Sequence, residues 1–312
     1  MNKSFYKSFY FIGCLFFLNS CTNKTTKYSN SSNVKKDNNL SYYLEKGKLD
    51  SAQYYIDKLY EENPNNIDVL INRGEVYFLL NQTEVSELSW NKCLSIDLNN
   101  ENCYEKLIGL YCGFYGLLEE DCTNILSETL TINQNNKVAL FFKAKRFANQ
   151  GNILEAINLY EDILEKDSKN LRILNELAIL EDTGYRAEMY YRKMLNIDSS
   201  YTAFYGLGMY FQKKRKFQNA LDNYNLALRI KDVKDSYYNM GYCYMRLNSF
   251  SEAINSFTKA IEIDGSYLQA YFARAYAYNQ IGDKSLAIED YKFCLMLEPG
   301  HGPAREELEK IK

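Results

Sequence analysis

The sequence has 312 residues, of which 46% are hydrophobic and 25% are charged, a composition typical of a folded chain rather than a disordered one. Its formal net charge of −3 gives no basic footprint for nucleic acid, so we expect no nucleic-acid partner. Histidine is central to general-base chemistry and zinc sites, and this chain has only His301. Since the catalytic and metal-ligand motifs are also missing, we expect no enzyme activity, no cofactor and no metal.

The first residues have the composition of a targeting signal. Residues 1–7 carry two lysines and no acid, and the apolar run at 8–18 is too short to span a bilayer as a mature helix. The segment Leu18-Asn19-Ser20-Cys21 then resembles a bacterial lipobox. This resemblance implies a lipoprotein signal peptide over 1–20 and acylation of Cys21. The alternative is an ordinary secretory signal with a chance cysteine.

Residues 22–37 are polar and basic, so together with Cys21 they form a predicted lipid-anchored tether over 21–37. Thr22 follows the cysteine, at the position where an aspartate would resemble an inner-membrane retention signal. We therefore expect a protein of the cell envelope that is anchored to a membrane, and most simply to the outer membrane facing the periplasm.

A period of about 34 residues runs through the rest of the chain. Ala220, Ala253 and Ala287 stand 33 and 34 residues apart, and an aromatic residue follows each alanine after four positions. One copy, at 234–267, shows the pattern of small and aromatic residues in full: Tyr237, Met240, Gly241, Tyr244, Ala253, Phe257, Ala260 and Gly265. A repeat of this length indicates stacked units that each lack a core of their own.

The pattern resembles the tetratricopeptide repeat (TPR) over residues 38–301. The resemblance implies an all-α solenoid, a right-handed superhelix of about eight helix-turn-helix pairs, and residues 302–312 are expected to form a C-terminal capping helix that opens near Pro303. Two copies depart from the pattern. Residues 101–136 contain two extra residues, and 171–200 is expected to have a shortened turn between its helices.

In this family the first helix of each unit lines a concave groove, with its fifth and ninth positions pointing inward. The corresponding residues in the last three repeats, together with a polar neighbour, are Tyr205, Met209, Tyr238, Tyr242, Phe272, Tyr276 and Asn279. We predict that they bind a protein or peptide partner, since aromatic anchors with a polar rim are typical of interfaces. Two alternatives stay open: some rings pack between units, or the groove of a nutrient-binding lipoprotein takes a glycan or small peptide.

The remaining cysteines allow two disulfides. Cys93 and Cys103, and likewise Cys112 and Cys122, are ten residues apart across a predicted turn. Some of these cysteines occupy small-residue positions of the repeat, so the sequence favours buried, unpaired thiols. Cys294 with His301 is the only nucleophile-and-base pair that suggests itself, and the repeat pattern argues against it.

Overall fold

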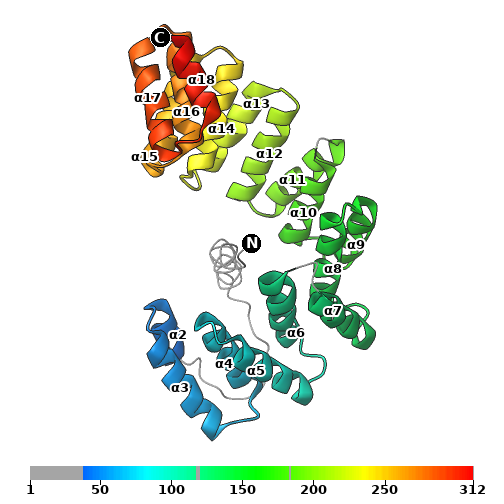
Figure 1. The fold of residues 1–312 in the computed structure, drawn as a ribbon. Coiled ribbons are helices and arrows are strands. Elements are labelled where there is room, and N and C mark those ends of the chain that lie inside the picture. Colours follow the sequence, from blue (N-terminus) through cyan, green and yellow to red (C-terminus); the bar gives the residue numbers. More distant parts are fainter. Residues whose placement is uncertain (1–37, 117–119, 183, 312) are drawn as a thin grey trace. The chain divides into compact units, whose positions relative to one another are not determined.

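The computed structural model describes residues 38–116, 120–182 and 184–311. Within these ranges the chain forms 17 α-helices and one π-helix, with no strand (Figure 1). The prediction of an all-α fold is confirmed. The predicted signal peptide, Cys21 and the tether lie outside the described residues.

The chain divides into two compact units, residues 1–163 and 164–312. The helices of unit 1 are α2 (Asn38–Glu45), α3 (Leu49–Glu62), α4 (Ile67–Leu79), α5 (Thr83–Ile96), α6 (Glu101–Ile108), the π-helix η1 (Gly109–Tyr115), α7 (Glu120–Ile132) and α8 (Lys137–Asn149). Helix α9 (Ile153–Lys166) spans the boundary between the units. The helices of unit 2 are α10 (Leu171–Glu181), α11 (Tyr185–Ile197), α12 (Tyr201–Lys213), α13 (Phe217–Leu228), α14 (Lys234–Arg246), α15 (Phe250–Ile263), α16 (Leu268–Gln280), α17 (Lys284–Leu297) and α18 (Gly302–Ile311).

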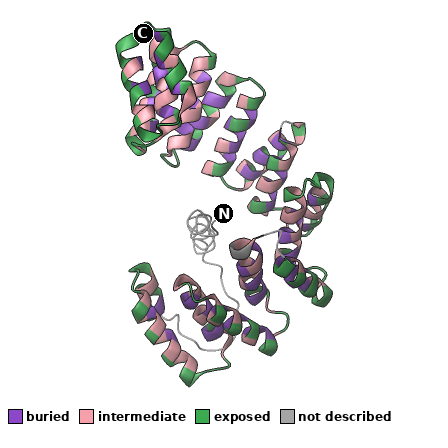
Figure 2. Ribbon diagram, viewed as in Figure 1, coloured by how far each residue is buried: buried purple, intermediate pink, exposed green. Residues whose placement is uncertain are grey.

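Within unit 2 each helix packs on the helix that precedes it and on the one that follows, from α10 to α18. The pairs α12/α13, α14/α15 and α16/α17 are the repeats that the sequence predicts. Buried residues lie along the sides of the helices that face these neighbours (Figure 2). Helix α18 follows the last pair and buries Ala304, Leu308 and Ile311, so it covers the end of the core with one apolar side.

The two helices of a pair meet where a glycine of the first faces an aromatic ring of the second. A Cβ atom added to Gly241 would lie 2.6 Å from Cε1 of Phe257, and one added to Gly208 would lie 2.5 Å from Cε1 of Tyr224. Both distances are too short for a real contact, so the ring rests directly on the glycine backbone. The Phe257 and Tyr224 side chains are fully buried there. Burying a large side chain of this kind stabilises the fold by roughly 1.5–3 kcal/mol.

The same arrangement recurs in unit 1, where a Cβ atom on Gly74 would lie 2.2 Å from Nε1 of Trp90. The alanines that set the period, Ala220, Ala253 and Ala287, are all completely buried. The small residues therefore occupy the close contacts that the repeat pattern predicts for them.

The turn after the first helix of a pair contains a residue in the left-handed backbone region. Four turns place asparagine or glycine there: Asn81, Gly151, Asn248 and Gly282. The turn after α12 places Arg215 there instead, with φ 59°. The Lys216 N–H closes this turn by donating to the carbonyl oxygen of Phe211 at 2.9 Å. The left-handed region is unfavourable for residues with a long side chain, whereas glycine and asparagine adopt it readily.

The long repeat at 101–136 places its extra residues in a π-helix. Helix α6 continues directly into η1 at Gly109, and the wider π-helical turn uses more residues over the same length of axis. The helix pair is therefore preserved despite the insertion.

Two disulfides connect the helices around this repeat. Cys93 in α5 is bonded to Cys103 in α6, and Cys112 in η1 is bonded to Cys122 in α7. All four residues are buried, so the expectation of burial was right and the expectation of unpaired thiols was wrong. The sequence alone could not show that the paired Cβ atoms come close enough to bond. Cys243 and Cys294 are buried free thiols.

The short repeat at 171–200 differs from our prediction. The turn at 182–184 has three residues, as the turn at 214–216 does, so the turn is not shortened. Helix α10 has 11 residues where α12 has 13, and α11 has 13 where α15 has 14. The missing residues are thus removed from the helix ends, where a shorter helix still leaves the close contact in the middle of the pair.

An arginine links three consecutive helices in the last repeats. The Arg274 guanidinium in α16 donates to both carboxylate oxygens of Asp290 in α17, each at 2.8 Å, and to Thr258 in α15 at 2.9 Å. Asp290 is buried, so this bidentate pair satisfies groups that would otherwise be costly to bury. In unit 1, Arg73 occupies the equivalent position and bonds to Asp57 in α3 and Ser89 in α5.

The contact between glycine and aromatic ring predicts a specific loss of stability. Replacing Gly241 by alanine should lower the free energy of unfolding by about 1–3 kcal/mol, because the added methyl group overlaps the Phe257 ring. Gly265 has open space around its Cβ position, so Gly265→Ala is the matched control, with an expected change within about 0.5 kcal/mol. Urea unfolding of both variants measures the difference, and equal stabilities would refute the proposed packing.

Candidate partner-binding surface

The first helices of the last three repeats lie side by side, since α14 contacts both α12 and α16. Two hydrogen bonds join α12 to α14. The hydroxyls of Tyr201 and Ser236 share one at 2.9 Å, and Nδ2 of Asn239 donates to the Tyr205 hydroxyl at 3.0 Å. The three helices therefore form one continuous surface within unit 2.

Rings at the fifth position of these helices pack downward onto the core. Each contacts the aromatic ring of the second helix in its own repeat, with centroid distances of 5.6–5.7 Å; the pairs are Tyr205 with Tyr224, Tyr238 with Phe257, and Phe272 with Tyr291. Aromatic contacts of this kind add to the stability gained from burial. The alternative that some rings pack inside the solenoid therefore describes the fifth position.

Further contacts hold the fifth-position rings in place. Tyr205 stacks on Tyr201 at 5.5 Å with an interplanar angle of 15°, and burial raises the pKa of its hydroxyl to about 12. Phe272 contacts the His301 ring at 5.4 Å. Nδ1 of His301 accepts the N–H of Ala304 at 3.1 Å, so the histidine caps the start of α18. These rings have little freedom to rearrange around a ligand.

Side chains at the ninth position are more accessible. Met209 is 37% exposed and Tyr276 is 42% exposed, while Tyr242 and Asn279 are half-buried. Tyr242 packs against Phe217 of α13 with ring centroids 6.5 Å apart, and Nη1 of Arg246 donates to its hydroxyl at 3.2 Å. The predicted groove residues thus separate into a fixed layer at position five and an accessible layer at position nine.

Phe217 belongs to this surface although the sequence analysis did not name it. The Arg246 guanidinium lies 5.4 Å from the Phe217 ring and 6.0 Å from the Tyr242 ring. A cation over two rings is favourable, and it holds the end of α14 against the start of α13. The signal in the sequence is a single aromatic residue that follows a run of basic residues, and no repeat position marks it.

Two other places on the described residues could have held chemistry. Burial raises the pKa of the Cys294 thiol to about 11, and Nδ1 of the neighbouring His301 is engaged in capping α18, so this pair provides no activated nucleophile near neutral pH. Across the described ranges, no group of three or more His, Cys, Asp or Glu side chains is placed to hold a metal ion.

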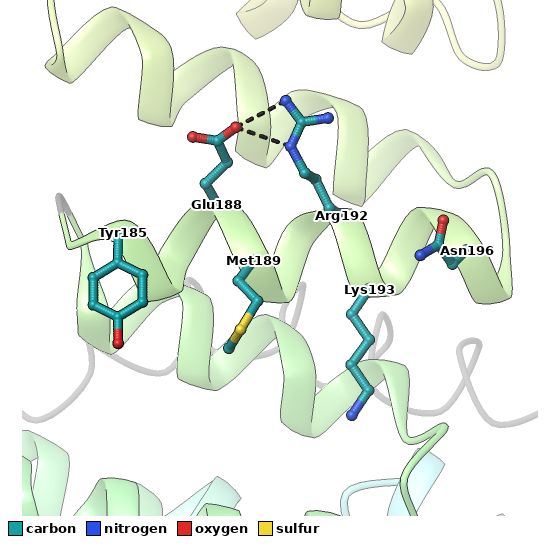
Figure 3. A pocket seen from close by; sticks show the side chains of 6 residues that line it. All are labelled: Tyr185, Glu188, Met189, Arg192, Lys193 and Asn196. Atoms are coloured by element: carbon teal, nitrogen blue, oxygen red, sulfur yellow. Dashed lines mark hydrogen bonds and ion pairs between the residues drawn. The ribbon is translucent and has the colours of Figure 1, made fainter.

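A shallow depression runs along α11 (Figure 3). Its lining comes from this one helix, and Glu188 is paired with Arg192 at 2.8 Å. The lining residues are Tyr185, Glu188, Met189, Arg192, Lys193 and Asn196. An open helix face of this kind does not enclose a ligand.

Comparisons with known proteins agree with the geometry of the last two helix pairs. The tetratricopeptide repeat family matches residues 235–267 and, as a second copy, residues 268–301. These two segments are tetratricopeptide repeats. The matched ranges coincide with α14/α15 and α16/α17, and the preceding pairs of the TPR solenoid follow the same helix-turn-helix plan.

Solved structures show the same fold. The APC/C hetero-tetramer Cut9-Hcn1 is similar over 87% of this chain, with 16% identity and a TM-score of 0.59, and this chain spans only 54% of that chain. MamA is 26% identical over 50% of this chain and 94% of its own, with a TM-score of 0.47. YrrB, a TPR protein with an unusual peptide-binding site, is 17% identical over 59% of this chain and 97% of its own, with a TM-score of 0.48.

No curated protein matches the sequence. Among the helices of the described residues, none is both long enough and apolar enough to cross a membrane.

The two layers of the surface predict different responses to substitution. Phe272→Ala should lower the free energy of unfolding by about 1–3 kcal/mol, because it removes the ring from its contacts with Tyr291 and His301. Tyr276→Ala, one turn further along α16, should change it by less than about 0.5 kcal/mol. Chemical denaturation distinguishes the two, and a larger loss for Tyr276→Ala would reverse the assignment of the layers.

Proposed function

We propose that this chain is a membrane-anchored TPR scaffold of the bacterial cell envelope, which binds a protein or peptide segment on the surface formed by α12, α14 and α16. The observation that carries the proposal is the accessible layer: Met209, Tyr242 and Tyr276 stand on adjacent helices above rings that the core holds in place. Apolar and aromatic side chains in such a row are typical interface anchors.

The rigidity of this surface also supports binding. The side chains beneath the accessible layer are fixed by ring contacts and by hydrogen bonds between helices, such as that from Asn239 to Tyr205. A partner would therefore lose its own freedom on binding while the scaffold loses little. This favours a short segment in an extended or helical form, laid across the three helices.

The envelope location is supported by two independent features. The lipobox-like segment ending at Cys21 provides a site for lipid attachment, followed by a polar tether. The two disulfides are of a kind that persists in oxidising compartments outside the cytosol. A tethered scaffold that presents a peptide-binding surface suits a role as an assembly factor for other envelope proteins.

A glycan-binding lipoprotein is the other candidate, and the ring geometry favours a peptide. A sugar stacks on an open aromatic face, whereas Tyr205 is already stacked on Tyr201, and Tyr238 lies between Phe257 and Tyr267 at 5.7 and 5.4 Å. Tyr242 and Tyr276 are the remaining tyrosines of the predicted set. Neither forms an ion pair or hydrogen bond with a carboxylate in the described part of the chain.

The groove is tested by replacing Met209, Tyr242 and Tyr276 together with serine. The control variant replaces three other exposed apolar residues, Tyr185, Met189 and Met296, with serine. Each mature protein serves as bait for affinity purification from solubilised envelopes, with partners identified by mass spectrometry. The groove variant should lose the captured partners at an unchanged melting temperature, and the control should retain them. Retained capture by the groove variant would place the binding site elsewhere.

The anchor is tested separately by Cys21→Ala. The variant should be released into the soluble fraction after lysis and should no longer incorporate radiolabelled palmitate, because the thiol that accepts the lipid is gone. Persistent membrane association of the variant would contradict lipid anchoring at this residue.

A further inference from the structure

The turn that joins α12 to α13 is basic, unlike the equivalent turns of the other repeats. Residues 213–216 read Lys-Lys-Arg-Lys, and all four side chains are exposed. The corresponding three-residue turns read Leu-Asn-Gln at 80–82, Gln-Gly-Asn at 150–152, Leu-Asn-Ser at 247–249 and Ile-Gly-Asp at 281–283. The basic run is therefore a feature of this repeat and not a requirement of the fold.

The backbone at this turn disfavours the residue that it carries. Arg215 has φ 59°, in the left-handed region that the matching turns fill with Asn81, Asn248, Gly151 and Gly282. An asparagine or glycine would satisfy the fold better at this position. Backbone strain that persists at one surface residue points to a role for its side chain outside folding.

A fifth cation stands beside this turn. Arg246 lies over Phe217, the residue that directly follows Lys216, and over the groove residue Tyr242. We call Lys213–Lys216 together with Arg246 the basic rim. Within the described residues, the one ion pair that these five side chains form joins Lys213 to Asp182. The Lys214 ammonium lies 6.0 Å from the Tyr210 ring.

We propose that the basic rim binds acidic side chains of the partner segment, so that the recognised sequence combines apolar residues with a run of aspartate or glutamate. This inference rests on the proposed function and specifies the chemistry of the same surface. Apolar side chains of the segment lie against Met209, Tyr242 and Tyr276, and its carboxylates reach the rim at the end of α12 and α14.

Charge complementarity selects this partner. The chain has 40 acidic residues against 37 basic ones, so five cations in one place stand out against an acidic whole. An acidic segment is attracted to the rim and repelled by most other surfaces, which fixes its orientation in the groove. Because the rim adjoins an aromatic surface through Tyr242, it fits a chain that carries both kinds of side chain better than a surface of anionic head groups alone.

The strained turn provides the sharpest test. Arg215→Asn restores the residue type of the other turns, so it should raise the melting temperature by a few degrees while it weakens binding of acidic peptides. Arg229→Gln is the matched control, since Arg229 lies at the opposite end of α13 and is also exposed. Opposite changes in stability and affinity for Arg215→Asn, with no change in affinity for Arg229→Gln, are the expected result.

The probe is a library of short random peptides displayed on phage and selected on the mature, oxidised full chain. Selected peptides should be enriched in Asp and Glu next to apolar residues, and raising the salt concentration should weaken them. The combined variant Lys214→Gln, Arg215→Asn, Lys216→Gln should bind them at least about tenfold more weakly. Neutral or basic selected peptides, no selection at all, or unchanged affinity of the variant would overturn the proposal.

Two further arms separate this inference from its neighbours. Vesicles rich in phosphatidylglycerol and a single-stranded oligonucleotide are offered in competition with the selected peptide, and stronger binding of either would overturn the assignment to an acidic peptide. Neutral peptides that bind the wild-type chain and lose binding when Met209, Tyr242 and Tyr276 are replaced would refute the acidic preference while leaving the proposed function intact.

Discussion

The structure depends on one contact, an aromatic ring of the second helix resting on a residue of the first helix that has almost no side chain. At Gly241 and Phe257, and at Gly208 and Tyr224, the ring occupies the space that a Cβ atom would need. This contact sets the distance between the two helices of a pair. It also places a ring where the next layer of side chains can pack on it, so the core extends from the contact toward the surface.

The binding surface follows from this geometry. Rings at the fifth position, such as Tyr238 and Phe272, take their places from the buried rings below them. The ninth position lies one helical turn beyond that support, so Tyr276 remains accessible. The turn after α12 adds a different constraint, because Arg215 adopts a backbone conformation that folding alone would assign to asparagine or glycine. A stable scaffold can carry one such unfavourable residue at a functional site.

The sequence predicted the repeat plan because recurring small and aromatic residues report directly on helix contact. It could not separate Tyr238 from Tyr242 in their roles, since both are tyrosines at inward positions and only the ring contacts distinguish them. It could not pair Cys93 with Cys103, because pairing depends on the distance between two helices. The π-helix at Gly109–Tyr115 was equally beyond reach, since an insertion in a helix can be absorbed by a wider turn or by a longer loop.

The most direct measurement is hydroxyl-radical footprinting of the native mature chain, with the oxidation of each tyrosine quantified by mass spectrometry. Ring exposure governs this reaction, and the 29 tyrosines supply internal references. Tyr224 and Tyr291, which are fully buried on the small residues of their partner helices, should be protected, while Tyr276 at 42% exposure should react readily. Oxidation of Tyr224 and Tyr291 at the rate of Tyr276 would contradict the helix contact and the surface built on it.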